Sequence, residues 1–203
     1  MSAIEGQSEC EDTTQKDTKT EIQFDDLKNI DTIAQALGGQ KKAFQKIAAK
    51  ILSILHSAIQ ELDEIVSFNN IEQFLLILKN GINFSVSEGL VATELLSRFI
   101  NKNTKREALG KRGVLYNDNI GTMLVCLTLI TQKICRDSVT TNSFFASQFT
   151  MQTSVLNLSE VTFLKLMQFD LWVEEKDFWK IFQEVANEQI EGEILNSSST
   201  IVI

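Results

Sequence analysis

The sequence predicts an all-α protein. Apolar residues recur at helical spacing in several segments, residues that can cap a helix precede many of them, and no segment shows the alternation of a half-buried strand. A chain of 203 residues is short enough for one domain to bury around a single core. We therefore expect six or seven helices in one domain, joined by short connections and flanked by tails.

The two ends of the chain differ from its middle in charge. Residues 1–26 hold eight acidic groups against two lysines and almost no large apolar side chains, which predicts a disordered acidic tail. Residues 188–203 add three glutamates and no base, which predicts a second acidic and polar tail. The segment 27–187 is almost neutral, so the formal net charge of −8 belongs to the ends.

The segment 27–69 is expected to be helical and to contain one break. Gly38 and Gly39 mark this break. After them, apolar residues at helical spacing predict a long amphipathic helix over about 41–66. The only histidine, His56, lies inside this helix, and no second ligand accompanies it in the sequence. We interpret it as a packed or surface residue.

Two further helices are expected before residue 101. Asn70 can cap the first, which has one apolar stripe and ends near Ile82. The second begins at Ser85, where the serine oxygen can accept a backbone N–H and Glu88 can reach back, the arrangement of a capping box. This helix is expected to run to about Ile100.

Residues 101–116 are predicted to form a basic connector. The segment contains two glycines and only one acidic residue. Such a loop can contact nucleic acid or an acidic protein, or assist nuclear import, but most charge clusters of this kind are simply solvated. Its basic residues are Lys102, Lys105, Arg106, Lys111 and Arg112.

Four more helices are expected in the second half of the chain. Residues 119–134 are apolar nearly all round, which indicates a helix buried at the centre of the domain. Thr141 opens a short helix up to residue 149. The segment 157–160 reads as a second capping box and predicts that a helix starts there. A final amphipathic helix is expected over 174–187.

The sequence offers little from which to build an enzyme, a metal site or a cofactor site. A zinc or catalytic histidine site has almost no residues available, because there is one histidine and no Cys-x-x-Cys pair. The pair Gly38-Gly39 lacks the lysine and the hydroxyl residue of a phosphate-binding loop. We therefore expect no enzymatic activity, no metal and no cofactor.

Composition also bounds the environment of the protein. No apolar run reaches the roughly 18 residues that a membrane span needs, so we expect no membrane partner. The negative net charge argues against a general nucleic-acid binder. Three cysteines, an odd number, are more typical of reduced thiols in an intracellular compartment, either cytoplasm or nucleus.

One stretch, 131–178, carries an ordered set of charged, aromatic and small residues. A helix ending in Lys is followed by Asp, by Asn with an aromatic residue and Ala, by Asn-x-x-Glu, by Phe-Leu, and by Phe-Asp-Leu-x-Val with a later aromatic residue. This order resembles the cyclin box, the five-helix bundle that binds and activates cyclin-dependent kinases. The matching residues are Lys133, Asp137, Asn142, Phe145, Ala146, Asn157, Glu160, Phe163, Leu164, Phe169, Asp170, Leu171, Val173 and Phe178.

The resemblance covers about residues 70–180 and is greatest to the single-box P/U-type cyclins. It implies a cyclin box over 70–173, with an added N-terminal helix packed beside it and a C-terminal helix at 174–187. Only about 20 residues follow Phe182, so the chain has no room for the second box of mitotic cyclins.

The resemblance also implies a partner and a binding site. Lys133 and Glu160 resemble the charged pair that hydrogen-bonds the kinase backbone just before the mobile C-helix. Docking would favour the inward position of that helix, which completes the Lys–Glu pair of the kinase, so the chain itself would perform no chemistry. The apolar positions against which the C-helix packs are matched by Ile134, Leu164, Phe169 and Leu171.

Other functions remain open at this point. Ser97 stands where the family commonly has Asp, and Thr131 where it has a small Ala. These departures and the charged tails are compatible with a cyclin-fold scaffold or assembly subunit of a larger complex that binds no kinase. Lys133 and Glu160 could equally form a salt bridge within the domain. A transcription-linked factor that contacts DNA through 101–116 is a third reading, and it predicts salt-dependent binding.

Overall fold

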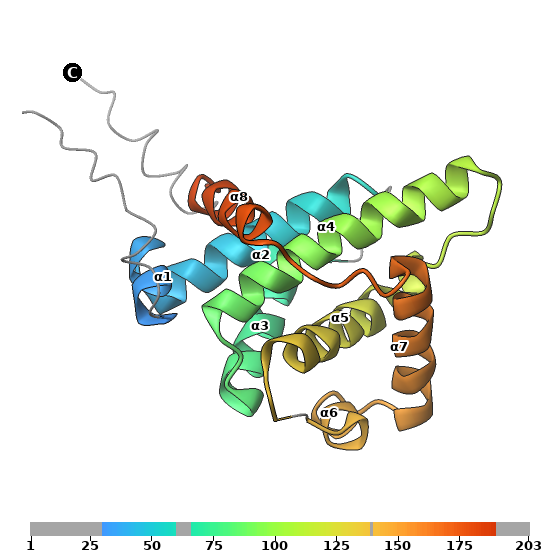
Figure 1. Cartoon of the computed structure of the whole chain (residues 1–203). Helices are drawn as coiled ribbons and strands as arrows, with labels where there is room; N and C mark the ends of the chain where they lie inside the picture. Colours follow the sequence, from blue (N-terminus) through green and yellow to red (C-terminus); the bar gives the residue numbers. More distant parts are fainter. Residues whose placement is uncertain (1–29, 60–65, 139, 190–203) are drawn as a thin grey trace, which may run out of the picture.

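The computed structural model describes residues 30–59, 66–138 and 140–189, and within them it is built of helices without any strand (Figure 1). The all-α prediction is therefore confirmed. The tails expected at 1–26 and, beyond residue 189, at the C-terminal end lie outside the described residues. The helices are α1 (Ile30–Ala36), α2 (Gln40–His56), α3 (Phe68–Ile82), α4 (Val86–Ala108), α5 (Ile120–Cys135), α6 (Asn142–Gln148), α7 (Thr153–Met167) and α8 (Glu175–Ala186), with a 3₁₀ turn η3 (Asn117–Asn119).

Helix α5 lies in the core of the molecule, as its apolar composition predicts. Its residues from Met123 to Gln132 are all buried. Two of them are threonines, and each donates its hydroxyl to a carbonyl one turn earlier, Thr128 to Leu124 and Thr131 to Leu127, which satisfies the buried oxygen within the helix. Helices α4 and α7 pack against α5 (Figure 1). Among the described helices, none combines the length and the apolarity needed to cross a membrane.

The N-terminal helices show the predicted break but a shorter second helix. Gly38 and Gly39 separate α1 from α2 with φ angles of 91° and 95°, which glycine adopts without steric cost. Of the helix expected over 41–66, the part up to His56 is helical, and residues 60–65 lie outside the described residues. The last turn of α2 tightens because the Ser57 hydroxyl donates to the Ile54 carbonyl at 2.6 Å, a local hydrogen bond that competes with the helix.

Two helix starts predicted from asparagines are wrong. Helix α3 is capped by Ser67 rather than Asn70, and Asn70 is the partner three residues on that completes the capping box. The segment 157–160 lies in the middle of α7, which starts at Thr153. There Asn157 accepts a hydrogen bond from Asn142 of α6 at 2.8 Å, so a contact between helices, not a cap, accounts for this residue.

The first half of the predicted basic connector is helical. Helix α4 begins with the predicted capping box of Ser85 and Glu88 but continues to Ala108, eight residues beyond Ile100. Asn103 explains the extension, because its buried side chain accepts the Val114 N–H at 2.8 Å and so folds the following loop back along the helix. Only the residues after Ala108 form a connector.

A buried ion pair joins the start of α4 to the end of α5. Glu88 is 5 % exposed, and its carboxylate accepts two hydrogen bonds from Arg136, at 2.5 and 2.8 Å. Arg136 also donates to the carbonyls of Ile82 and Asn83. The bidentate pair therefore fixes the α3–α4 corner against the central helix.

Candidate functional site

The charged pair expected from the sequence forms within the chain. Lys133, in the last turn of α5, and Glu160, in the middle of α7, lie 2.5 Å apart between Nζ and Oε1. The second carboxylate oxygen accepts from Asn142 at 2.6 Å, and the same amide donates to Asn157. Three helices thus contribute to one polar cluster. Its ionic members are partly exposed, at 27 % for Lys133 and 15 % for Glu160.

The apolar residues expected beside this pair divide into two kinds. Leu164 and Leu171 are partly buried and pack against the core. Ile134 and Phe169 are exposed, at 42 % and 70 %. The first two therefore form the base of an apolar surface, and the other two stand out from it.

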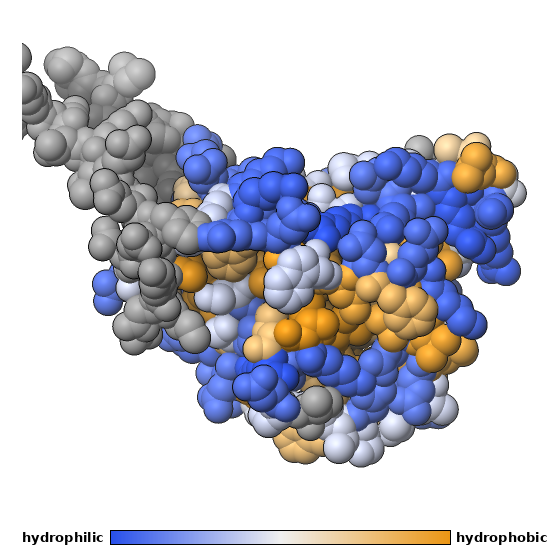
Figure 2. All heavy atoms as spheres, in the orientation of Figure 1, coloured by the Kyte–Doolittle hydropathy of each residue, from blue (hydrophilic) through white to orange (hydrophobic). Residues whose placement is uncertain are grey.

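These apolar residues lie next to the polar pair or to one another, either along the chain or through one hydrogen bond. Ile134 follows Lys133, Leu164 lies one helical turn after Glu160, and the Phe169 N–H donates to the Leu164 carbonyl at 3.0 Å. Figure 2 shows an apolar area on this side of the molecule, bounded by hydrophilic residues. We call it the α5–α7 surface. Its residues are Ile134, Leu164, Phe169, Leu171 and Trp172.

The backbone after α7 turns Phe169 outward. Gln168 and Phe169 both adopt left-handed conformations, with φ angles of 57° and 58°. For a residue with a side chain this conformation costs about 1 kcal/mol. The turn caps α7, because the Phe169 N–H donates to the Leu164 carbonyl, but the exposed ring of Phe169 gives the fold no packing in return. Strain of this kind clusters at functional positions.

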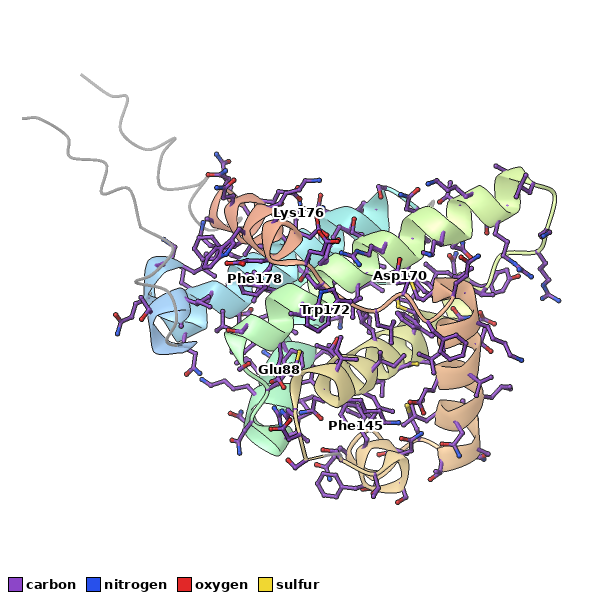
Figure 3. All side chains as sticks on the ribbon, in the orientation of Figure 1. Glu88, Phe145, Asp170, Trp172, Lys176 and Phe178 are labelled. Atoms are coloured by element: carbon purple, nitrogen blue, oxygen red, sulfur yellow. The ribbon has the colours of Figure 1, made fainter. Side chains whose placement is uncertain are left out.

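Arg98 of α4 holds the segment that follows. Its guanidinium donates to the Trp172 carbonyl at 2.7 Å and to the Asp177 carboxylate of α8 at 2.9 Å, while Glu94 accepts from its Nε. Figure 3 places Trp172 on this segment between α7 and α8. One side chain therefore fixes both the segment and the first turn of α8.

Trp172 is the residue of this surface that the sequence analysis missed. It is 80 % exposed, the largest exposure among the exposed large apolar residues of the described chain. The alternation of Leu171, Trp172 and Val173 could have predicted this exposure. Leu171 and Val173 pack against the core, so the side chain between them in an extended segment points away from it. A tryptophan in the outward phase of an extended segment is a candidate contact residue.

The chemistry available at the surface is that of binding. Below the polar pair, burial raises the pKa of the Cys126 thiol to about 12, a shift that Glu160 reinforces and Lys133 opposes, so the thiol stays protonated and unreactive at neutral pH. No cluster of metal-ligating side chains occurs within the described ranges. The arrangement offers exposed aromatic and aliphatic groups beside a lysine and a carboxylate. Comparisons of the chain with family models, with curated protein sequences and with solved structures found no match.

Proposed function

We propose that the protein is a cyclin-like regulatory subunit that binds and activates a cyclin-dependent-type protein kinase. The C-helix of the kinase docks on the α5–α7 surface. One observation carries the proposal: the Lys133–Glu160 pair lies beside Ile134 on the surface from which Phe169 projects at 70 % exposure. The order of five consecutive helices, α3 to α7, with α5 buried among them, supports the same function.

The exposed aromatic residues supply a large part of the binding energy. Aromatic side chains bury 150–250 Å² each, so covering Phe169 and Trp172 at their observed exposures removes on the order of 300 Å² from water. At about 25 cal/mol per Å² this is worth roughly 7 kcal/mol before the cost of association. The aromatic contacts alone are comparable to that cost, so measurable affinity also needs the polar pair and Ile134.

The polar pair can bind backbone groups without being broken. The Lys133 ammonium has three donors, and Glu160 engages one of them. The others can donate to backbone carbonyl groups of the kinase just before its C-helix. Glu160 retains lone pairs on both oxygens and can accept a partner N–H. Lys133 and Glu160 therefore fix the register of the docked helix.

Activation follows from a shift in the conformations of the kinase. The docked C-helix is held inward, where its glutamate pairs with the lysine that positions the phosphates of ATP. The cyclin-like chain contributes no group to the phosphoryl transfer.

A charge-swap series tests the proposal against a purely structural salt bridge. Lys133→Glu combined with Glu160→Lys keeps an attractive pair inside the domain, and the Asn142 amide can turn its oxygen toward the new lysine. We expect the double variant to unfold at nearly the same urea concentration as the native chain but to lose the kinase on co-purification from native extract. Unchanged kinase recovery would refute the assigned role of the pair.

A second candidate function is a scaffold or assembly subunit that binds no kinase. The observation that favours it is that both carboxylate oxygens of Glu160 are already engaged within the chain, by Lys133 and Asn142. Phe169 and Trp172 would then pack against a neighbouring subunit. Stoichiometric recovery in a large complex, with no stimulation of any purified kinase, would favour this function over the first.

A further inference from the structure

A strongly basic pocket lies at the far end of α4, away from the polar pair. It has a volume of about 280 Å³, and its lining comes from the ends of α4 and α7 and from the loop after Ala108. Two leucines and Gln168 supply the rest of its lining. Its cationic residues are Lys102, Lys105, Arg106, Lys111 and Lys165.

Most of this positive charge is not neutralised by the described chain. Lys102 pairs with Asp170, but their charged groups are 3.9 Å apart, which is long for an ion pair. Within the described ranges, Lys105, Lys111 and Lys165 form no ion pair. Like charges that face one concave space repel one another and concentrate their field there. The pocket is therefore suited to an anionic ligand.

The lining favours an acidic peptide over a single phosphate or a nucleic acid. Lysines are flexible point charges and give little of the forked recognition that compact phosphates receive from arginine. The pocket's lining contains no aromatic residue on which a base could stack. Leu109, 74 % exposed, offers apolar contact between the charges, as a peptide requires.

We propose that this pocket binds the acidic N-terminal segment of the same chain, residues 5–17. This segment holds Glu5, Glu9, Glu11, Asp12 and Asp17 against one lysine, whereas residues 27–187 are almost neutral. Residues 188–203 hold only three acidic groups, and one of them, Glu188, is already paired with Lys50, so charge complementarity favours the N-terminal segment as the partner.

The chain is long enough for this contact within one molecule. The segment ends 13 residues before α1 and begins 25 residues before it, a span of roughly 40–80 Å at about 3.3 Å per extended residue. Helix α1 packs against α4, and the whole of α4 is only about 35 Å long at 1.5 Å per residue. The acidic segment, connected to α1, is therefore long enough to reach the pocket in the same molecule.

Cys10 allows a direct test in the full-length chain. A nitroxide spin label is attached to Cys10 in a Cys135→Ser background, in which Cys126 is buried and does not react. We expect the amide NMR signals of residues 105–111 and 165–168 to lose intensity selectively at about 20 mM salt. The loss should disappear near 0.5 M salt, where charges are screened beyond about 4 Å.

Matched variants separate the pocket from charge in general. Lys105→Gln, Lys111→Gln and Lys165→Gln together should abolish the signal loss. The control variant, Lys79→Gln with Lys176→Gln and Lys180→Gln, removes the same amount of charge from α3 and α8. This variant should still show the selective loss of NMR signal.

Four outcomes would overturn the proposal. The first is no selective loss, and the second is an equal loss in the pocket variant. The third is a loss that appears only when spin-labelled chains are mixed with separate isotope-labelled chains, which would make a second copy the occupant. The fourth is binding of a DNA probe at low salt that the pocket variant loses, which would make nucleic acid the ligand.

Discussion

Replacing Arg136 by methionine should destabilise the fold strongly, because it leaves the Glu88 carboxylate buried without its cation. Glu88 is 5 % exposed and would keep only the Ser85 N–H, at 2.8 Å. The carbonyls of Ile82 and Asn83 would also lose a donor. Breaking a buried ion pair in this way costs about 3–5 kcal/mol, and the 28 % exposure of the Arg136 side chain places the expected loss near about 3 kcal/mol.

The double variant Glu88→Gln/Arg136→Met should be less destabilised than the single one. It removes the isolated charge, and the amide oxygen can still accept the Ser85 N–H that completes the cap of α4. We expect a loss of about 1–2 kcal/mol, because uncharged groups cost less to bury than an unpaired carboxylate. The second substitution should thus restore part of the stability that the first removes.

Urea unfolding followed by circular dichroism measures both values. With a slope of about 2 kcal/mol per molar urea, the midpoint should fall by about 1.5 M in Arg136→Met and by about half of that in the double variant. The exposed pair of Lys176 and Glu174 serves as the control, and Lys176→Met should leave the midpoint unchanged. Two results would refute the reasoning: a double variant that is as unstable as Arg136→Met, or an Arg136→Met variant whose free energy of unfolding falls by less than about 1 kcal/mol.

Three further predictions concern other parts of the molecule. Phe169→Gly should raise the free energy of unfolding by up to about 1 kcal/mol, because it relieves a left-handed residue whose ring is exposed, yet weaken partner binding in a pull-down. Cys126 should stay unmodified by iodoacetamide at pH 8 in peptide mass spectra of native protein, since its pKa is about 12; rapid modification would contradict its burial. Burial opposes the charge of Lys50, but Glu184 and Glu188 overcome this effect and raise the pKa of Lys50 above 10.5. The ion pairs that attach α8 to α2 should therefore be fully formed below pH 10.5 and should weaken as the pH rises through the raised pKa. Near-ultraviolet circular dichroism would show this loosening of α8.

Helix starts could be predicted where all the partners lie within a few residues. Ser85 and Glu88 form a capping box by themselves, and the structure contains it. Asn70 belongs to such a box as well, but as its fourth residue, because Ser67, three positions earlier, is the N-cap. Asn157 is a residue type that commonly caps helices, but here it joins two helices, since it accepts a hydrogen bond from Asn142 of α6. Local pattern cannot separate these cases.

Only the resemblance brought Lys133 and Glu160 together as a pair, and whether the surface around them binds a partner stays a prediction. Lys133 and Glu160 are 27 residues apart, and no periodicity links them. The extent of α4 depends on Asn103 and its contact with Val114, eleven residues later. The exposure of Trp172 depends on which phase of a short extended segment faces the core. Each of these is a tertiary property that a single helix does not encode.

Arg98 mechanically connects the α5–α7 surface to helix α8. The same guanidinium holds the backbone of Trp172 and the first turn of α8. Helix α8 is in turn anchored to α2, because Lys46 donates to the Ala186 carbonyl and Lys50 pairs with Glu184. Because coupling between two sites is reciprocal, a ligand that orders Trp172 must also tighten the attachment of α8. Conversely, a change that draws α8 away from α2 would loosen the backbone of Trp172, so the position of α8 would control how firmly the α5–α7 surface is held.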